Sequence, residues 1–430
     1  MRILVIGGGG REHALVWKIT QSPLVEKIYC APGNAGIAQI AECVPLKVTD
    51  VEGLANFAES QKIDLTVVGP EAPLIAGIVD RFTKRGLKAF GPSAAPAQLE
   101  GSKAFAKQVM QSAGIPTAGY WICDSLAEAQ GCVKDYFVSQ GAEAKIVVKA
   151  DGIAAGKGVM VVQGEAAANE ALLRTMGDRI FGASGDRVVL EECLEGEEAS
   201  IMAITDGETV IPLVPSQDHK RIFEGDKGPN TGGMGAYTPV PVIPANTVQV
   251  TLERVLKPAV QAMKAQGTPY RGILYAGIIV TTEGPKCIEF NCRLGDPETE
   301  AVLPMLESDL VPLLLRSLDG SLGQAEVRWR EGASVCVVAA SGGYPGDYKT
   351  GKPIAGLEQV ATLDDTLVFH AGTRFADDKV VTDGGRVLVV TGLGSDLPAA
   401  LSHAYTGLSQ LHFEGIYYRR DIAARVLKKG

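Results

Sequence analysis

Two oxygen donors and a guanidinium alternate in the segment 288–293, whose sequence is IEFNCR. If this segment is a strand, Glu289, Asn291 and Arg293 share one face, because successive side chains of a strand point to opposite sides. A carboxylate and an amide oxygen are hard donors that suit Mg²⁺ bridging phosphate groups, and a neighbouring arginine can hold an anion. The segment predicts a divalent-metal site, and the alternative is a half-buried strand with one solvated polar face.

A glycine-rich loop separates two apolar runs in KADGIAAGKGVMVV, residues 149–162. It is not a P-loop, because the first gap is one residue short and Gly158 replaces the hydroxyl that would hold magnesium. The loop joins two expected strands, so it could fold over phosphates as a lid, with backbone N–H groups and Lys157 as donors. A plain β-hairpin is the alternative.

The sequence GGGGREH, residues 7–13, follows an apolar run and opens an expected helix. It departs from the dinucleotide fingerprint G-x-G-x-x-G, because Glu12 stands at the third glycine position and no acidic residue ends the second strand, at Cys30 and Ala31. NAD is therefore disfavoured. A glycine turn at a helix N-terminus beside Arg11 suits a single phosphate monoester. A purely structural turn is the alternative.

Two further loops, APGNAG at 31–36 and GPEAPL at 69–74, follow later strands of the same region. Asn34 and Gly36 offer amide and backbone donors, and Glu71 between two prolines can accept from sugar hydroxyls. Each residue alone is compatible with an ordinary loop. If the loops meet the glycine turn in one crevice, together they describe a sugar-phosphate site.

Charged residues also gather at 191–198 and at 216–221 (SQDHKR). The first stretch holds five carboxylates, one of which could receive adenosine hydroxyls, although a solvated edge is the alternative. The second stretch carries Asp218 and Lys220 directly before a glycine-rich segment, and a charged loop is its alternative. The five carboxylates are those of Glu191, Glu192, Glu195, Glu197 and Glu198.

The elements that must position these residues follow an α/β pattern. Across the first hundred residues, apolar runs bounded by Gly and Pro, among them VPLKV at 44–48, alternate with helical segments, which predicts a parallel sheet of βαβ units with ligands at the carboxyl ends of its strands. Ser102 can cap a helix that stops at Gly114, and further helices are expected near 165–176 and 397–411. We expect three domains, over 1–102, 103–325 with a small subdomain at about 123–188, and a strand-rich one over 326–430.

Bulk properties exclude several classes of protein. The chain has 430 residues, 41 basic and 50 acidic, and its net charge of −9 disfavours nucleic acid as a partner. Its 8 cysteines form no C-x-x-C pair, which is typical of a reducing cytosol without disulfides or structural zinc. No signal peptide and no apolar stretch of about 18 to 20 residues is present, so we expect a cytoplasmic protein without a membrane partner.

Taken together, ten segments resemble, in order and spacing, the phosphoribosylamine-glycine ligase family of ATP-grasp enzymes. The resemblance spans essentially the whole chain, and the ten segments in register make it specific although each is weak alone. The segments are VIGGGGREHAL, APGNAG, VGPEAPL, LEGSKAF, KADGIAAGKGV, EGEEAS, SQDHKR, GPNTGGMGAYTP, IEFNCRLGDPET and GGYPGDY.

The resemblance implies a pre-ATP-grasp domain with a Rossmann-like parallel sheet, an ATP-grasp clamp of two subdomains and a C-terminal α+β domain. It also implies ATP, Mg²⁺ or Mn²⁺, glycine and 5-phosphoribosylamine as ligands, with glycinamide ribonucleotide, ADP and phosphate as products. We expect a monomer rather than an oligomer. Another ATP-grasp ligase acting on a purine-pathway ribonucleotide, an NAD-dependent oxidoreductase and a catalytically silent nucleotide-binding regulator stay open as alternatives.

The family's functional positions fall on matching residues of this sequence. The resemblance places metal ligands at Glu289 and Asn291, and we take Arg293, Asp218 and Lys157 as catalytic candidates, the first for the glycine carboxylate and the second for its ammonium. Expected ATP-binding residues are Lys103, Lys149, Gly156, Lys157, Gly158, Glu191, Cys193, Leu194 and Glu198. Expected substrate-binding residues are Gly9, Gly10, Arg11, Glu12, Asn34, Gly36, Glu71, Asp218, Lys220 and Arg293.

Overall fold

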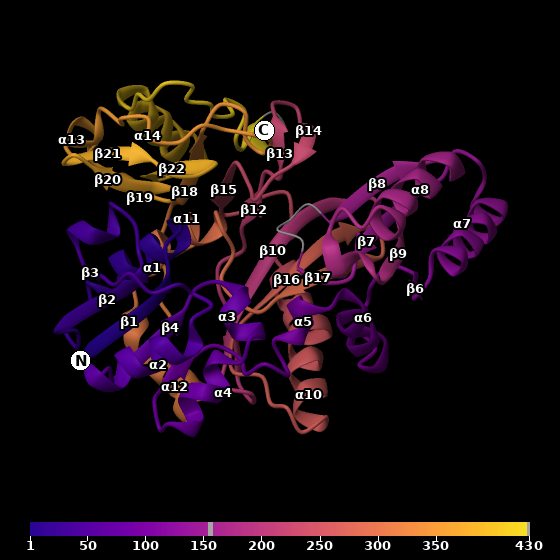
Figure 1. Cartoon of the computed structure of the whole chain (residues 1–430), viewed down its shortest axis with the longest axis horizontal. Helices are drawn as coiled ribbons and strands as arrows, with labels where there is room; N and C mark the ends of the chain where they lie inside the picture. Colours follow the sequence, from indigo (N-terminus) through magenta and orange to yellow (C-terminus); the bar gives the residue numbers. More distant parts are fainter. Residues whose placement is uncertain (154–157, 428–430) are drawn as a thin grey trace.

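The computed structural model describes residues 1–153 and 158–427 of the chain. The molecule is elongated (Figure 1). A parallel sheet and a C-terminal sheet lie at one end of its long axis, and a small antiparallel sheet lies at the other. A second antiparallel sheet connects them. The polar segments singled out above therefore come from different sheets, which the fold must bring together.

The N-terminal sheet has the strand order β3-β2-β1-β4-β5 and is parallel throughout, as predicted. The expected strand at 44–48 is absent: β3 stops before Pro45, which has no N–H to donate to a sheet. Its strands are β1 (Arg2–Gly7), β2 (Lys27–Pro32), β3 (Glu42–Cys43), β4 (Leu65–Val68) and β5 (Ala89–Phe90). Its helices are α1 (Gly10–Ile19), α2 (Val51–Ser60), α3 (Glu71–Ile75) and α4 (Ile78–Lys84).

Two helices lead from this sheet to the small subdomain, α5 (Gln98–Gly101) and α6 (Lys103–Ser112). Ser102 caps α6, as predicted, by accepting a hydrogen bond from the Phe105 backbone N–H at 3.1 Å. Asp151, at the end of a strand of the small subdomain, accepts from the Ala104 N–H (3.1 Å) and from the Ser102 hydroxyl (3.0 Å). The N-terminus of α6 is thus tied to the small subdomain.

The small subdomain is a four-stranded antiparallel sheet of order β6-β9-β7-β8 with a hydrophobic core of its own. It begins at Tyr120 and ends at Glu192, slightly outside the expected range of 123–188, because β6 and β9 pair with each other. The strands are β6 (Tyr120–Cys123), β7 (Lys145–Ala150), β8 (Val159–Gln163) and β9 (Val188–Glu192). The helices are α7 (Leu126–Gln140) and α8 (Glu165–Leu172), the latter continued by one π turn.

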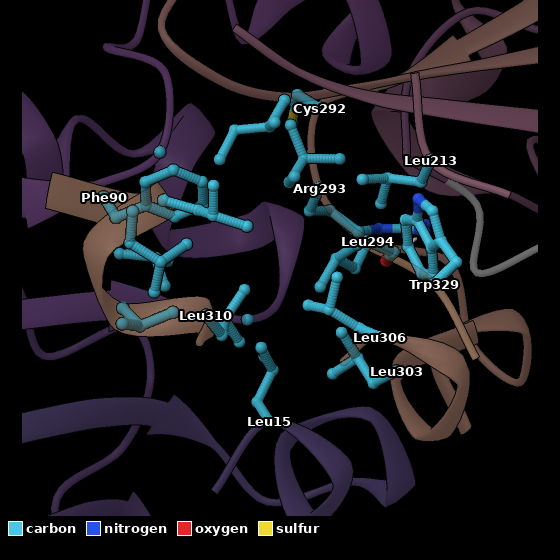
Figure 2. A pocket seen from close by; sticks show the side chains of 18 residues that line it. Leu15, Phe90, Leu213, Cys292, Arg293, Leu294, Leu303, Leu306, Leu310 and Trp329 are labelled. Carbon is cyan, nitrogen blue, oxygen red and sulfur yellow. Dashed lines mark hydrogen bonds between the residues drawn. The ribbon is translucent and has the colours of Figure 1, made fainter. Parts of the chain in front are cut away.

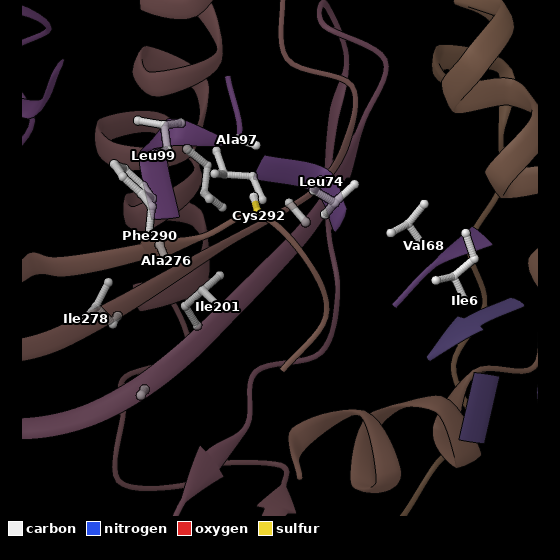
Figure 3. Close-up of a cluster of buried hydrophobic side chains, with 14 of the residues drawn as sticks. Ile6, Val68, Leu74, Ala97, Leu99, Ile201, Ala276, Ile278, Phe290 and Cys292 are labelled. Carbon is white, nitrogen blue, oxygen red and sulfur yellow. The ribbon is translucent and has the colours of Figure 1, made fainter. Parts of the chain in front are cut away.

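The connecting sheet has the order β11-β10-β16-β17 and is antiparallel. Figure 3 shows its buried side chains, among them Ile201, Ala276 and Phe290, near Ala97 and Leu99 of the preceding segment. Its strands are β10 (Glu197–Thr205), β11 (Val210–Pro212), β16 (Gly272–Thr281) and β17 (Gly284–Asn291). Its helices are α9 (Thr247–Thr251), α10 (Lys257–Ala265), α11 (Glu298–Val302) and α12 (Leu310–Asp319).

The C-terminal sheet recruits strands from the middle of the chain, which the sequence did not lead us to expect. Its order is β12-β15-β18-β22-β19, and the glycine-rich GAYT segment forms β15, paired with β18. The sheet contains β12 (Gln217–Asp218), β15 (Gly235–Thr238), β18 (Ala333–Ala340), β19 (Thr366–His370) and β22 (Arg386–Gly394). Around it lie the hairpins β13 (Arg221–Phe223) with β14 (Lys227–Asn230) and β20 (Thr373–Ala376) with β21 (Lys379–Thr382), and the helices α13 (Leu357–Val360), α14 (Leu397–Gln410) and α15 (Ala424–Leu427).

Helix α12 follows the connecting sheet in sequence but packs against the N-terminal domain. Leu310, Val311 and Leu314 of α12 share one buried cluster with Ile3 and Leu15 of that domain. The N-terminal sheet and the connecting sheet therefore meet through a common hydrophobic core. Across residues 1–153 and 158–427, no helix has both the length and the apolar content needed to cross a membrane.

Candidate active site

Strand β17 carries the predicted metal ligands in the predicted alternation from Glu289 onward. The expected burial of Ile288 is not found, because a bulge leaves this residue half-buried. Phe290 and Cys292 are 3% and 1% exposed, whereas Glu289 and Asn291 are half-buried on the other face. Glu289 is opposite Gly277 of β16, where a bulge interrupts the register. Because a Cβ at position 277 would lie 3.0 Å from the Glu289 Cγ atom, the glycine leaves room for this carboxylate. The two oxygen donors thus share a face of one strand.

Three lysines from separate elements surround Glu289. Lys103 Nζ donates to the Gly152 carbonyl at 2.9 Å, and Lys149 Nζ donates to the Ile288 carbonyl at 3.1 Å. Lys220 Nζ lies 4.0 Å from Glu289 Oε1. Burial raises the pKa of Glu289, but the charges of these lysines outweigh it and hold the pKa below its usual value. Glu289 is therefore an ionised carboxylate in a basic surrounding.

Glu191 occupies a buried position between two lysines. Its two carboxylate oxygens each lie 2.7 Å from a lysine Nζ, one from Lys107 and one from Lys149. All three side chains are at most 8% exposed. The Glu191 side chain is therefore committed to the protein interior and is not placed to receive ribose. Lys107 escaped the sequence analysis, because nothing in its local pattern indicates that it pairs with a residue 84 positions away.

The remaining ATP-binding candidates lie where the small subdomain joins the connecting sheet. Cys193 and Leu194 are half-buried in the segment that links β9 to β10. Glu198, on β10, lies 3.0 Å from Lys220. The Gly158 carbonyl accepts from the Ala150 N–H at 2.9 Å, at the neck of the glycine-rich loop. The candidates Gly156 and Lys157 lie outside the described residues.

Asp218 lies in a second group of ionisable side chains beside Glu289. Burial raises the pKa of Asp218 from its usual 3.8 to about 7; Lys220 opposes this shift, and nearby carboxylates, above all Glu298, reinforce it. Glu298 accepts hydrogen bonds from the hydroxyls of Tyr275 (2.6 Å) and Ser200 (3.1 Å). Glu298 was not among the predicted site residues, although it belongs to the same segment as Asn291.

The glycine turn of the first domain faces the end of β17. The Gly9 N–H donates to Glu12 Oε2 at 2.7 Å, and Arg11 Nε donates to Glu12 Oε1 at 2.6 Å. Arg11 Nη1 donates to the Leu294 carbonyl at 3.2 Å. Arg11 and Glu12 are 7% and 2% exposed, so this ion pair is internal. The turn and the predicted metal strand therefore belong to one region of the molecule.

Asn34 and Gly36 support that turn from the neighbouring loop. Asn34 Nδ2 donates to the Gly8 carbonyl (3.0 Å) and to the His370 carbonyl (2.7 Å). Its Oδ1 atom accepts from the N–H groups of Gly36 (3.0 Å) and Ile37 (2.9 Å). The amide holds the two glycine loops and the C-terminal domain together, and its contact with a substrate stays a prediction.

Position 36 has no room for a side chain, because two histidine rings pack against Gly36. A Cβ at this position would lie 2.4 Å from the His13 ring and 2.5 Å from the His370 ring. Burial lowers the pKa of His13 to about 3 and that of His370 to about 4, so both imidazoles are neutral at pH 7. The first and third domains thus meet here without charge.

Arg293 bridges two carboxylates from the first part of the chain. Its Nη2 atom lies 2.8 Å from Glu100 Oε1, and its Nε atom lies 3.2 Å from Glu71 Oε2. Nη2 also donates to Asn291 Oδ1 at 3.4 Å, which connects it to the predicted metal ligands. Glu100 was missed in the sequence, although the segment LEGSKAF that contains it was recognised.

A pair of carboxyl groups lies beneath the glycine turn. Asp296 Oδ1 is 3.0 Å from Arg386 Nη1 of the C-terminal domain. Glu300 is fully buried, and a Cβ at Gly10 would lie 2.4 Å from its Oε1 atom. Burial and the Asp296 charge raise the pKa of Glu300 well above its usual value. All three domains converge at this point.

An apolar cavity lies behind Arg293 (Figure 2). Leucines, Phe90 and Trp329 line it, and Arg293 and Cys292 form part of its wall. Its volume is about 30 Å³. Because a cavity that admits benzene measures about 150 Å³, this one is too small for any of the expected substrates. The polar side chains gathered around Glu289, and not this cavity, form the candidate active site.

The donor set of the cleft fits a polyphosphate and a hard cation. Lys103 directs its ammonium group to a main-chain carbonyl, and Lys149 is shared between the Ile288 carbonyl and Glu191 Oε1, so Lys103 is the one of the two without a carboxylate in contact. Within the described ranges, no three His, Cys, Asp or Glu side chains converge on one metal-sized point. Glu289 and Asn291 supply only two oxygen ligands, which suits Mg²⁺, since this ion commonly completes its shell with water and substrate phosphates.

Three domains of one family match the chain. They are described as the phosphoribosylglycinamide synthetase N domain, over residues 1–100, the ATP-grasp (A) domain, over 101–299, and the C domain, over 334–425. Together they account for most of the sequence.

Curated relatives match over the full length. The chain is 50% identical over 424 residues to phosphoribosylamine–glycine ligase of Caldanaerobacter subterraneus subsp. tengcongensis, covering 99% of this chain and 100% of that protein. It is also 50% identical over 435 residues to phosphoribosylamine–glycine ligase of Escherichia coli strain K12, covering 100% and 99%.

Solved structures agree with these relatives. The crystal structure of phosphoribosylamine–glycine ligase from Thermotoga maritima matches with a TM-score of 0.84 and 33% identity, over 98% of this chain and 100% of that one. A biotin carboxylase from Campylobacter jejuni, solved as a β-γ-ATP complex, matches with a TM-score of 0.73 over 97% and 92%, and at 17% identity it supports the fold alone. The chain belongs to the phosphoribosylglycinamide synthetase family.

Proposed function

We propose that the protein ligates glycine to 5-phosphoribosylamine with ATP, giving glycinamide ribonucleotide, ADP and phosphate. The observation that carries this proposal is the contact between Arg11 and the Leu294 carbonyl, at 3.2 Å. It brings a glycine turn suited to a sugar phosphate against the strand that holds Glu289 and Asn291. One cleft can therefore receive the sugar, the nucleotide and the amino acid together.

The reaction requires ATP because an amine does not displace oxide from a carboxylate at neutral pH. Transfer of the γ-phosphoryl group to the glycine carboxylate gives glycyl phosphate, whose phosphate is a good leaving group. The amine of phosphoribosylamine then attacks the acyl carbon, and the C–N bond forms as phosphate departs. This chemistry depends on neutralising anionic charge while the reactants are held in line.

Lys103 and Lys149 would hold the phosphates of ATP, together with Lys157 and the Gly156 and Gly158 backbone of the glycine-rich loop. Glu289 and Asn291 would hold Mg²⁺ or Mn²⁺, which neutralises charge on the γ-phosphoryl group when bound. The adenine would lie against the backbone of Cys193 and Leu194, since Glu191 is turned inward between two lysines. Glu198, which neighbours Lys220, is the more accessible carboxylate for ribose.

Arg293 and Asp218 are the proposed contacts of glycine. The Arg293 guanidinium is ionised and lies within 3.4 Å of Asn291, so it can hold a carboxylate near the phosphoryl group. Asp218 is a half-buried carboxylate with a pKa of about 7, poised to accept a hydrogen bond from an ammonium group when ionised. Lys220 and Glu298 complete the charge balance around it.

The phosphate of phosphoribosylamine would bind the turn at the backbone of Gly10 and Arg11, because the Gly9 N–H already donates to Glu12 Oε2. Its ribose would meet Glu71. The internal Arg11–Glu12 pair and Asn34 keep this turn rigid, and the substrate amine is therefore delivered from a fixed position. Fixed positioning of two reactants is worth effective molarities of about 10⁵ M or more. The glycine-rich loop would exclude water from the acyl phosphate.

The domain organisation and setting belong to the same proposal. We propose a first domain over 1–102 for the sugar phosphate, an ATP-grasp domain over 103–325 whose small subdomain closes on the nucleotide, and a C-terminal domain over 326–430 that completes the cleft. The protein would act as a cytoplasmic monomer on small molecules.

The test is ADP release measured with each substrate omitted in turn. The proposal requires both glycine and freshly prepared phosphoribosylamine for rapid turnover. Equal ADP release without glycine, or with a purine ribonucleotide replacing phosphoribosylamine, would instead identify another ATP-grasp ligase.

A further inference from the structure

Arg293 has two carboxylate partners, which differ in their distance from the guanidinium and in their exposure. Glu100 lies 2.8 Å from Nη2, and Glu71 lies 3.2 Å from Nε. The Glu100 side chain is 7% exposed, whereas that of Glu71 is 24% exposed. The guanidinium is therefore held unequally from two sides.

Glu100 is fixed by more than this ion pair. Its second oxygen, Oε2, accepts from the Cys292 backbone N–H at 2.8 Å and from Cys292 Sγ at 3.1 Å. One carboxylate thus holds both the main chain at the end of β17 and the side chain of the next residue. Burial raises the pKa of Glu100 and Arg293 lowers it, so an ionised Glu100 needs the guanidinium beside it. Separating this pair would leave a buried charge without compensation.

Among the described residues, the Glu71 side chain accepts from the Arg293 guanidinium and from its own backbone N–H, and no second side chain bonds to it. It stands in the first turn of α3, in a different domain from β17. Burial raises the pKa of Glu71, but the charges of Arg293 and Arg11 outweigh burial and hold the pKa below its usual value. Glu71 is therefore ionised and able to accept hydrogen bonds from hydroxyl groups. A partly exposed carboxylate can exchange one cationic partner for neutral donors and water at modest cost.

Glu71 and Arg293 are assigned to two different substrates under the proposed function, on which this inference rests. Glu71 faces the ribose and Arg293 faces the glycine carboxylate. In the structure they neutralise each other, which leaves Arg293 fewer N–H groups for an incoming anion. The Arg293 guanidinium also donates to the Leu294 carbonyl at 3.2 Å and to Asn291 Oδ1 at 3.4 Å.

We propose that Glu71 is an exchangeable partner of Arg293 and Glu100 a permanent one, so that sugar hydroxyls binding Glu71 release Nε of Arg293 for the glycine carboxylate. Occupation of the sugar site then strengthens glycine binding, and by reciprocity glycine strengthens sugar binding. Glu100 is a positioning residue in this scheme, because it acts on glycine only through Arg293.

The experiment measures the Kd of glycine by calorimetry, in the presence of Mg²⁺ and a non-hydrolysable ATP analogue, with and without saturating ribose 5-phosphate. Ribose 5-phosphate serves as the stable stand-in for the substrate sugar. For the wild-type protein, the sugar phosphate is expected to tighten glycine binding about tenfold, a typical coupling between two sites. Absence of any coupling would overturn the proposal.

Two variants separate the roles of the carboxylates. In Glu71→Gln, glycine should bind more tightly than in wild type without the sugar, and ribose 5-phosphate should change its Kd less than twofold. In Glu100→Gln, glycine should bind more weakly in both conditions while the coupling persists. Weaker glycine binding in Glu71→Gln without the sugar would contradict the exchange, and this readout does not depend on whether the variant still binds the sugar.

Glu52→Gln is the matched control, because Glu52 pairs with Arg81 on the surface of the same domain and should leave the Kd unchanged. Thermal midpoints establish that each variant is folded. Substrate-omission assays on the wild-type protein test the ligase function separately. If ADP release needs both substrates but the coupling is absent, only the exchange is wrong; if ADP release does not need glycine, the proposed function itself fails.

Discussion

The two halves of the cleft treat charge in opposite ways. Around the glycine turn, each buried guanidinium lies against carboxylates: Arg11 against Glu12, and Arg293 against Glu71 and Glu100. Around the glycine-rich loop, Lys103 and Lys149 direct their ammonium groups to carbonyls as well, and Lys149 shares the single carboxylate of Glu191 with Lys107. In the first half every guanidinium is thus neutralised by carboxylates, three against two, whereas in the second half three lysines outnumber the carboxylates of Glu191 and Glu289.

This difference indicates which kind of ligand each half binds. A balanced network is rigid without a ligand and is suited to a substrate with one phosphate that binds to backbone N–H groups. A lysine-rich network is stabilised when a polyanion binds to it, and a nucleoside triphosphate with its metal is such a ligand.

Replacing Glu289 should have the largest effect. Glu289→Ala removes the only proposed carboxylate ligand of the metal on β17, and loss of several kcal/mol of charge stabilisation is expected to lower ADP release by about 10³-fold or more. The measurement is a coupled ADP assay. Glu283→Gln, at the turn of the same β-hairpin, changes an exposed glutamate paired with Lys286 and should leave the rate within twofold of wild type. Comparable activity in Glu289→Ala would show that the metal lies elsewhere.

In the balanced half, removing one charge should cost stability. Arg11→Met leaves the Glu12 carboxylate buried without its cation, at a cost of about 3 kcal/mol, measured by urea unfolding. Arg330→Met removes a pair with Asp365 in which both side chains are more than 40% exposed, and should cost about 0.5 kcal/mol or less. If the two substitutions cost the same, the idea of a pre-balanced turn is wrong.

The pH dependence should report Asp218. Its pKa of about 7 predicts that kcat/KM for glycine rises as the pH increases through 7, because only the ionised carboxylate accepts from the ammonium group. Asp218→Asn should remove this pH dependence and lower kcat/KM by about tenfold or more at pH 8.

The raised pKa of Asp218 also affects stability. Because the unfolded chain loses this proton near pH 4 and the folded protein only near pH 7, the free energy of unfolding falls as the pH rises from about 4 through 7. Asp218→Asn should therefore melt at a higher temperature than wild type at pH 8, and a lower midpoint would refute the assignment.

The lysine-rich half should respond to a polyanion alone. In EDTA, inorganic tripolyphosphate at ten times its Kd is expected to stabilise the protein by about 1.4 kcal/mol, a rise of about 2 °C in the thermal midpoint. Lys103→Met should remove at least half of that rise. Lys257→Met, at a helix position where the lysine pairs with Glu253 outside the cleft, should retain all of it. Equal losses in both variants would mean that the anion binds by general surface charge.

Local patterns in the sequence predicted the elements well. The alternation of Glu289 and Asn291 with Phe290 follows from the period of a strand, and the Ser102 cap follows from its position before a helical run. The parallel first sheet and the helix at 397–410 follow from apolar runs bounded by Gly and Pro. The family resemblance added the order of the domains and candidate residues that local patterns alone left ambiguous.

Long-range partners were beyond the same reasoning. Glu100 reaches Cys292 and Arg293 across more than 190 positions, and no local pattern encodes that distance. β15 joins the C-terminal sheet for the same reason: GAYT is short, and its pairing with the distant β18 and with β12 makes it a strand. Asn34 illustrates a further difficulty, because an amide that can bind a ligand can equally bind two carbonyls of its own chain.

The position of α12 has a consequence for synthesis. Ile3 and Leu15 are buried with Leu310 and Leu314, so the first hundred residues emerge from the ribosome roughly two hundred residues before their core can be completed. At about 5–20 residues per second this delay is roughly 10 to 40 s. During that time the nascent first sheet exposes apolar surface, and chaperones that hold apolar segments should associate with it until α12 leaves the exit tunnel.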